Sequence, residues 1–523
     1  MTTQKILTGS THRLLARSTG VIGGLTGVSR VLGFVRDLVI ATAFGTGVGA
    51  EAFVVSFRIP NMLRDLVGEG ATNAAFVPVL TECHEKKKEE FWPLVSTLFF
   101  IMAGILLLFS VAGIIFAPQV VRLMAPGFLN SQDPGKFPLT VKLTQAMFPY
   151  LLLIGLSALA MGVLNSLKEF TSSALGPILL NLSMIVTGYF FEPAYGPMAL
   201  VAGVLCGGVL QLACQVPALL KSGFKISRPV FHHESAKKIG RLLIPRALGS
   251  ALYQINVFVD SILASFESIV GTGGQSALYY SNRLFQLPLA IFGLSLAQAI
   301  LPTFSTQMVK QDIQGFKDTF SLAVRSLMLV ALPASAGLVV LSGPIIRIIF
   351  QHGRFNEYST SITSSALFFY AFGLLSCCLI KLLVNAFYSM QDTRTPLKTM
   401  TFSVALNVVF CLVLMRPLKI GGLTLASTLS ATVNMGLLYH FLRKKVGAIE
   451  EKRICVSFLK ILFASLLMGA AAFFYNHWVL DPHLLSSRLS QALYLLMGII
   501  LSVLFYLGLT FLLKIEEIRK FFP

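Results

Sequence analysis

Apolar runs of about 20 residues, the length that an α-helix needs to cross a bilayer, recur along nearly the whole chain. Of the 523 residues, 55% are hydrophobic and only 12% are charged, and the mean hydropathy is +0.76. This pattern predicts an all-α polytopic membrane protein. The runs indicate fourteen transmembrane helices, centred roughly on Val31, Arg64, Gly104, Leu153, Leu182, Cys206, Phe258, Gly293, Val330, Phe372, Leu406, Leu429, Met468 and Leu501.

The distribution of lysine and arginine predicts the orientation of these helices, because cytoplasmic loops carry the excess of positive charge. The even-numbered connections are basic, as in residues 86–88 and 443–453, whereas residues 266–276 contain no lysine or arginine. We therefore expect both termini in the cytoplasm. The same rule, with the arginines inside the spans, accounts for the formal net charge of +19, so nucleic acid is not an expected partner. We expect no cleavable signal peptide before the first helix, because the N-terminal segment lacks a short apolar core.

An internal repeat with an offset of about 225 residues divides the predicted spans into two sets of six. The segment AFVVSFR (52–58) aligns with ALYYSNR (277–283), VLNS (163–166) with LVNA (383–386), and Gly196 with Gly421. Because six is even, the two sets share one orientation and predict two lobes around a central cavity. The expected domains are residues 1–225, residues 226–450 preceded by a basic amphipathic cytoplasmic linker, and residues 451–523 with the two extra helices.

The first two predicted spans carry an unusual number of ionisable residues. A charge at bilayer depth is costly and persists only when it faces a bundle interior or a wet cavity. Guanidinium groups suit bidentate phosphate recognition, so these arginines predict a phosphate or pyrophosphate site, to which the second repeat adds Arg283. Structural ion pairing and snorkelling toward the surface are the alternatives; pairing is weakened for sequence neighbours, which do not face one another on a helix. The residues are Arg30, Arg36, Asp37, Glu51, Arg58, Arg64 and Asp65.

Other chemistries find little support in the sequence. The seven cysteines lie in or beside apolar runs without a metal-ligand spacing, and His232 and His233 lie in the basic linker without ligand partners. No GxxxxGK[ST] loop is present, so ATP hydrolysis is not expected. A membrane enzyme needs catalytic carboxylates on sizeable loops, and the loop of residues 117–139 offers only Asp133. We therefore expect a transporter and not an enzyme, with no cofactor.

Several motifs resemble the MurJ (MviN) family of lipid II flippases, and the resemblance covers essentially the whole chain. They are SRVLGFVRD (29–37), AFVVSFRIPNMLR (52–64), EGA (69–71), AFVPVL (75–80), YYSNR (279–283), LSGP (341–344) and FYSMQDTRTP (387–396). The resemblance implies the multidrug/oligosaccharidyl-lipid/polysaccharide exporter fold. It also implies a substrate, the undecaprenyl-pyrophosphate-linked disaccharide pentapeptide called lipid II, which is flipped across the bacterial inner membrane for cell-wall synthesis.

The same resemblance implies site residues. Arginines matching Arg30, Arg36, Arg64 and Arg283 line the family's cavity, an acid matches Glu51, and a groove toward the last two helices guides the lipid tail. Glu51 replaces an expected aspartate, and Gln286 replaces an acid that some members carry, which weakens a carboxylate role there. Secondary candidates are Asp37, Arg58 and Asn61.

The energy source is left open between the membrane potential and ion coupling. Some relatives hold Na⁺ in the second lobe, where Asp260 and Asn385 offer oxygen ligands; plain helix hydrogen bonding is the alternative for both residues. Membrane lipids and cell-wall synthesis proteins are the expected partners besides lipid II. The alternative function is a related exporter of drugs or of another polyprenyl-linked glycan, which would not need the same arginine set.

Overall fold

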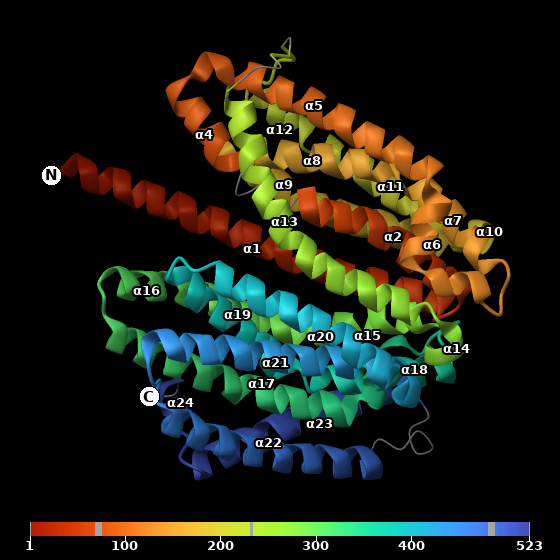
Figure 1. Ribbon diagram of the computed structural model, residues 1–523, viewed down its shortest axis with the longest axis vertical. Helices are drawn as coiled ribbons and strands as arrows, with labels where there is room; N and C mark the ends of the chain where they lie inside the picture. Colours follow the sequence, from red (N-terminus) through yellow and green to blue (C-terminus); the bar gives the residue numbers. More distant parts are fainter. Residues whose placement is uncertain (1, 68–75, 228, 231–233, 480–486, 522–523) are drawn as a thin grey trace. The chain divides into compact units, whose positions relative to one another are not determined.

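The computed structural model describes residues 2–67, 76–227, 229–230, 234–479 and 487–521, and all regular secondary structure in these ranges is helical. The chain divides into two compact units, residues 1–262 and residues 263–523. The helices of both units are drawn in Figure 1.

The first unit contains thirteen helical segments among its described residues, the last of which continues two residues past Ile262. They are α1 (Thr2–Phe44), α2 (Val48–Val67), α4 (Val77–Lys86), α5 (Lys88–Ile115), α6 (Ala117–Met124), η2 (Pro126–Asn130), α7 (Lys136–Met147), α8 (Pro149–Ser166), α9 (Thr171–Phe190), α10 (Glu192–Tyr195), α11 (Met198–Ala213), α12 (Val216–Lys221) and α13 (Glu234–Ala264).

The second unit is also built from helices, one of which, η3, is a π-helical segment. They are α14 (Glu267–Val270), α15 (Gly274–Pro288), η3 (Leu289–Leu294), α16 (Ser295–Val309), α17 (Ile313–Phe350), α18 (Glu357–Ala371), α19 (Leu374–Ser389), α20 (Arg394–Leu418), α21 (Ile420–Val446), α22 (Glu451–Val479), α23 (Arg488–Leu512) and α24 (Glu516–Phe521).

Within the described residues, nine helices are long and apolar enough to cross a membrane, and the pair α18 and α19, bent by 47°, makes a tenth if it is one span. The chain is therefore a multi-span helical membrane protein. The remaining four predicted spans fall on α1, α2, α13 and α21, and three of these helices include residues whose side chains the structure does not describe. The count of fourteen therefore stays a prediction.

Packing assigns the start of α13 to the first unit. Ile239 is buried in a core formed with α4, α5 and α8, and Lys238 Nζ donates to Glu82 Oε2 of α4 at 2.6 Å. This division after Ile262 differs from the expected boundary at residues 225 and 226. The difference arises because the amphipathic linker packs as part of α13 against the helices that precede it.

The two units repeat the same turns. Three positive-φ residues in the first unit recur 223 or 224 residues later: Lys168 with Gln391, Gly196 with Lys419, and Gly223 with Gly447. The hydroxyl of Ser56 donates to the carbonyl of Ala52 at 2.7 Å, and that of Ser281 donates to the carbonyl of Ala277 at the same distance. These turns place Lys419, and not the expected Gly421, opposite Gly196.

Candidate functional site

Arg36 is held in a buried polar cluster of the first unit, although it lies within an apolar stretch of α1. The residue is 6% exposed, and its Nε and Nη2 donate to Asp37 Oδ1 at 3.0 and 2.8 Å. Its Nη1 donates to Asn181 Oδ1 of α9 at 2.9 Å, and Asn181 Nδ2 donates to the Ser29 carbonyl at 3.1 Å. Ion pairing, the alternative that was considered weakened for sequence neighbours, is present here, because the long arginine side chain folds back onto the short carboxylate beside it.

Glu51 forms a buried ion pair that the sequence analysis missed. It lies in the first turn of α2 at 1% exposure, and its Oε2 accepts from the Nζ of Lys136, the first residue of α7, which is fully buried. Lys136 Nζ also lies 4.1 Å from the centroid of the Phe128 ring. In the sequence, a lysine beside a long apolar run is expected at the membrane surface, so Lys136 itself did not indicate a buried ion pair. The only indication was Glu51, because a buried carboxylate needs a positively charged partner.

The other candidates of the first unit differ in exposure. Arg30 is exposed on α1, and Arg58 on α2 is partly buried. The Oδ1 atom of Asn61 is buried without a hydrogen-bond partner among the residues that the structure describes. Arg64 belongs to α2, but its side chain lies outside the described residues, so its predicted role stays a prediction.

Arg283 presents a partly buried guanidinium on α15 of the second unit. Its Nη2 donates to the Tyr279 hydroxyl at 3.3 Å, and its Cζ lies 5.1 Å from the centroid of the Tyr279 ring, a cation–π arrangement that fixes the side chain. Gln286, one turn further, is exposed. Lys381 on α19 is an exposed cation in an otherwise apolar segment, which the sequence analysis did not single out although it fits the argument made for Arg30.

The two residues suggested for sodium lie in different units. Asp260 is partly buried on α13, and Asn385 on α19 donates its Nδ2 to the Ala297 carbonyl of α16 at 2.6 Å. Hydrogen bonding to a helix backbone, the alternative interpretation, therefore holds for the Asn385 amide nitrogen. Its carbonyl oxygen still has ligand chemistry, so the sodium site stays a prediction.

Asp392, in the FYSMQDTRTP segment, closes the turn between α19 and α20. Its Oδ1 accepts from the backbone N–H groups of Arg394 and Thr395, each at 3.0 Å, and its Oδ2 accepts from the Thr395 hydroxyl at 2.6 Å and from Lys445 Nζ at 2.5 Å. Burial raises the pKa of Asp392, but the hydrogen bonds from Lys445 and Thr395 outweigh it and hold the pKa well below the usual range.

We expect Asp392→Asn to lower the midpoint of thermal unfolding at neutral pH, with a difference from wild type that shrinks progressively as the pH falls below about 3.9. A carboxylate whose pKa is lower in the folded than in the unfolded state stabilises the fold above its unfolded pKa of about 3.9, and this contribution is lost as the pH falls through the folded pKa. Unfolding midpoints measured from neutral pH to about pH 2 test this. The control is Asp133→Asn, an exposed turn residue. A difference that stays constant through the acid range would contradict the proposed origin.

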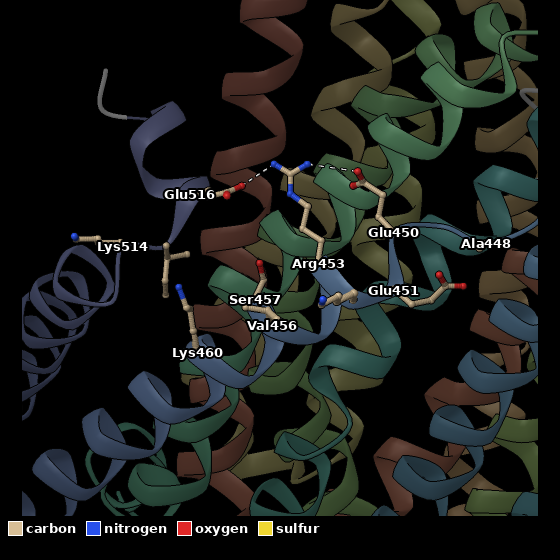
Figure 2. A pocket seen from close by; sticks show the side chains of 11 residues that line it. Ala448, Glu450, Glu451, Arg453, Val456, Ser457, Lys460, Lys514 and Glu516 are labelled. Atoms are coloured by element: carbon tan, nitrogen blue, oxygen red, sulfur yellow. Dashed lines mark hydrogen bonds and ion pairs between the residues drawn. The ribbon is translucent and has the colours of Figure 1, made fainter.

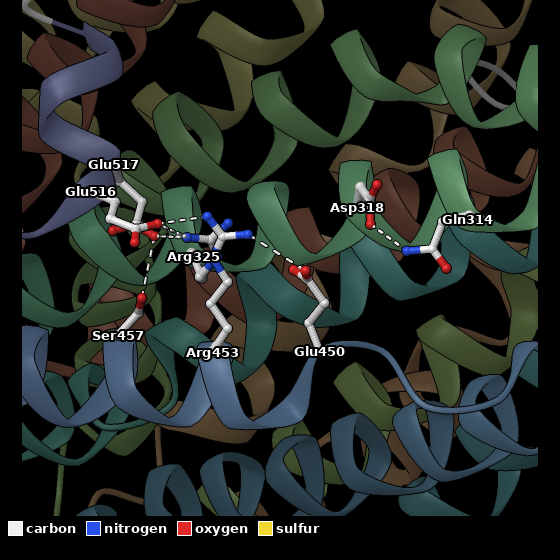
Figure 3. A network of polar contacts seen from close by, with 8 residues as sticks. All are labelled: Gln314, Asp318, Arg325, Glu450, Arg453, Ser457, Glu516 and Glu517. Carbon is white, nitrogen blue, oxygen red and sulfur yellow. Dashed lines mark hydrogen bonds and ion pairs between the residues drawn. The ribbon is translucent and has the colours of Figure 1, made fainter.

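A further buried ion pair ties the C-terminal helix to the rest of the second unit (Figure 3). Arg325 of α17 pairs with Glu517 of α24, and both side chains are almost fully buried. The hydroxyl of Ser457 of α22 donates to Glu517 Oε1 at 3.3 Å. Glu516 accepts from Arg453 Nη2 at 2.6 Å. These ion pairs and hydrogen bonds link α17, α22 and α24, which are distant in sequence.

Comparison with known proteins points to one family. A family model described as "Lipid II flippase MurJ" matches residues 40–494. A "Probable lipid II flippase MurJ" of Haemophilus influenzae is 36% identical over 476 residues, which is 87% of this chain and 92% of that protein. One of Vibrio cholerae with the same description is 35% identical over 519 residues, or 96% and 97% of the two chains.

Solved structures agree in fold. A structure of "Lipid II flippase MurJ, inward closed conformation" superimposes with a TM-score of 0.80 at 24% identity, covering 95% of this chain and 99% of that one. An inward-facing multidrug resistance transporter of the MATE family gives a TM-score of 0.67 at 12% identity, covering 81% and 96% of the two chains. At these identities the likeness concerns the fold alone.

Proposed function

The chain belongs to the MurJ family of lipid II flippases, and we propose that it moves lipid II from the cytoplasmic to the outer leaflet of the bacterial inner membrane by alternating access. The family match over residues 40–494 carries this proposal. A pyrophosphate and sugars cannot cross about 30 Å of hydrocarbon unaided, whereas the polyprenyl tail can remain in lipid. The protein therefore has to supply a polar path for the head group only.

In this proposal, Arg30 and Arg283 bind the pyrophosphate directly. Arg30 is exposed within a predicted span, and Arg283 keeps its guanidinium fixed by Tyr279. Arg36 already donates hydrogen bonds to Asp37 and Asn181, so in this proposal it contributes to the site as part of a preorganised cluster of these three side chains. Glu51 contributes through its pair with Lys136, and Arg64, Arg58 and Asn61 extend the site along α2. A related exporter of drugs shares the fold, but it has no need of this arginine set.

The proposed architecture has fourteen spans in two six-helix lobes, with both termini in the cytoplasm. The three turns that recur 223 or 224 residues apart support the duplication. The unrepeated helices α22 and α23 are proposed to guide the lipid tail. Rocking of the lobes then exposes the site to one leaflet at a time. The membrane potential drives the cycle at about 2.3 kcal/mol per charge per 100 mV, or Na⁺ held by Asp260 and Asn385 drives it.

Reconstitution tests the function directly. We expect proteoliposomes that contain the protein and lipid II to expose lipid II to a membrane-impermeant hydrolase added outside, at a rate well above protein-free vesicles. Vesicles carrying a different polyprenyl-linked glycan serve as the specificity control. Protection of lipid II together with export of the other glycan, or of a soluble drug, would retain the fold and reject the substrate.

A further inference from the structure

A pocket of about 570 Å³ lies in the second unit, where α22 begins and α23 ends (Figure 2). Its walls are formed by residues of the α21–α22 connection, the first turns of α22 and the segment between α23 and α24. The Arg325–Glu517 pair anchors α24 to α17 behind it. The pocket therefore has a fixed backbone frame at one end of two membrane-spanning helices.

Each acidic side chain of the pocket pairs with an arginine. Glu516 accepts from Arg453 at 2.6 Å, and Glu450 pairs with the same guanidinium at 3.5 Å. Glu451 pairs with Arg443 Nε at 3.0 Å. The lining also holds three lysines, Lys452, Lys460 and Lys514, so that its four cations outnumber its three carboxylates.

These lysines have donors to spare. Lys460 Nζ donates to the Leu513 carbonyl at 3.1 Å at the end of α23, which leaves two of its three N–H groups for a ligand. Lys514 has a positive φ of 50° at the helix terminus, where glycine is usual, and its side chain is exposed. Lys452 is exposed on the first turn of α22.

Exposed apolar side chains continue from the pocket along both helices. Val456 and Leu459 are exposed on α22, and Phe511 and Leu512 are exposed at the end of α23. A soluble phosphate would use only the lysines, whereas a lipid would also cover this apolar surface. Lysines at the end of membrane-spanning helices beside exposed apolar residues are the pattern that anionic lipid head groups recognise.

We propose that this pocket binds an anionic phospholipid of the surrounding bilayer. The head-group phosphate contacts Lys452, Lys460 and Lys514, and the acyl chains contact the exposed apolar residues at the start of α22 and the end of α23, beside the surface of these helices proposed to guide the tail of lipid II. This lipid is a resident of the fold and is not the transported substrate. The lysines of the pocket are different residues from the proposed substrate-binding arginines of α1 and α15, and the test of lipid binding does not depend on transport.

The test is lipid binding to the detergent-purified full chain, followed by native mass spectrometry during titration with dioleoyl phosphatidylglycerol or dioleoyl phosphatidylcholine. We expect one tight phosphatidylglycerol site, and at least about tenfold weaker binding of that lipid to Lys452→Gln/Lys514→Gln. The matched control is Lys398→Gln, which changes an exposed lysine near the start of α20. Thermal unfolding and size exclusion identify variants that fail to fold. The single variant Lys514→Gln, which changes the pocket less than the double variant does, provides a second measurement of phosphatidylglycerol binding.

The outcomes are distinct. Weakened phosphatidylglycerol binding in folded pocket variants but not in Lys398→Gln supports the site. Equal binding to wild type and folded pocket variants overturns it, as does equal affinity for phosphatidylcholine. Displacement of phosphatidylglycerol by millimolar inorganic phosphate would assign the pocket to a soluble anion and reject a lipid.

Discussion

Replacing Arg283 with glutamine is expected to slow lipid II exposure in proteoliposomes by roughly 10- to 100-fold, because a hydrogen bond to a charged group contributes about 1.5–3 kcal/mol. Arg283 is partly buried and is oriented by Tyr279, so its fork-shaped donor is held before the substrate arrives. Arg283→Lys retains the charge but loses bidentate geometry, and we expect an intermediate rate. The measurement is the initial rate of cleavage by an external hydrolase.

Arg347→Gln is the matched control for this series. Arg347 is an exposed arginine near the end of α17 and has no place in the proposed site. We expect its rate to equal that of wild type. If Arg283→Gln is folded, inserted and as fast as Arg347→Gln, the guanidinium of α15 does not bind the head group.

Much of the fold was predictable because its strongest determinants are local. Long apolar runs identify membrane helices, and the positive-φ residues of three turns recur with nearly constant spacing. Sequence similarity misplaced some matches, since Asn165 and Asn385 are three residues out of step with those turns. The turns of the two units still correspond in backbone conformation, because a turn depends on φ and ψ and tolerates glycine, lysine or glutamine at the same position.

The site was less predictable because it depends on contacts between distant segments. Candidate charges could be identified from their apolar context, but the partners Asn181 for Arg36 and Lys136 for Glu51 are 145 and 85 residues away. Arg325 and Glu517 are separated by 192 residues, and neither stood out in the sequence. The sequence therefore indicates that charges are buried, whereas the structure is needed to show how each charge is neutralised.

The Glu51–Lys136 pair gives the second large expected effect. We expect Lys136→Met to destabilise the first unit by about 3–5 kcal/mol, because it leaves Glu51 as an uncompensated buried carboxylate. Glu51→Gln should have an effect of similar size through the buried ammonium. The Ser56 hydroxyl, which accepts from Thr144 at 3.0 Å, joins the same two helices and keeps them in contact. Unfolding midpoints of the purified variants measure the loss.

The double variant Glu51→Gln/Lys136→Met separates packing from transport. Removing both charges abolishes the unpaired ion, so we expect most of the stability to return. If Glu51 also acts on the substrate, the lipid II exposure rate of the stable double variant should remain below about a tenth of wild type, which corresponds to about 1.4 kcal/mol. Recovery of stability and rate together would show that the pair only holds α2 against α7, and would remove Glu51 from the substrate site while leaving the role of Arg283 intact.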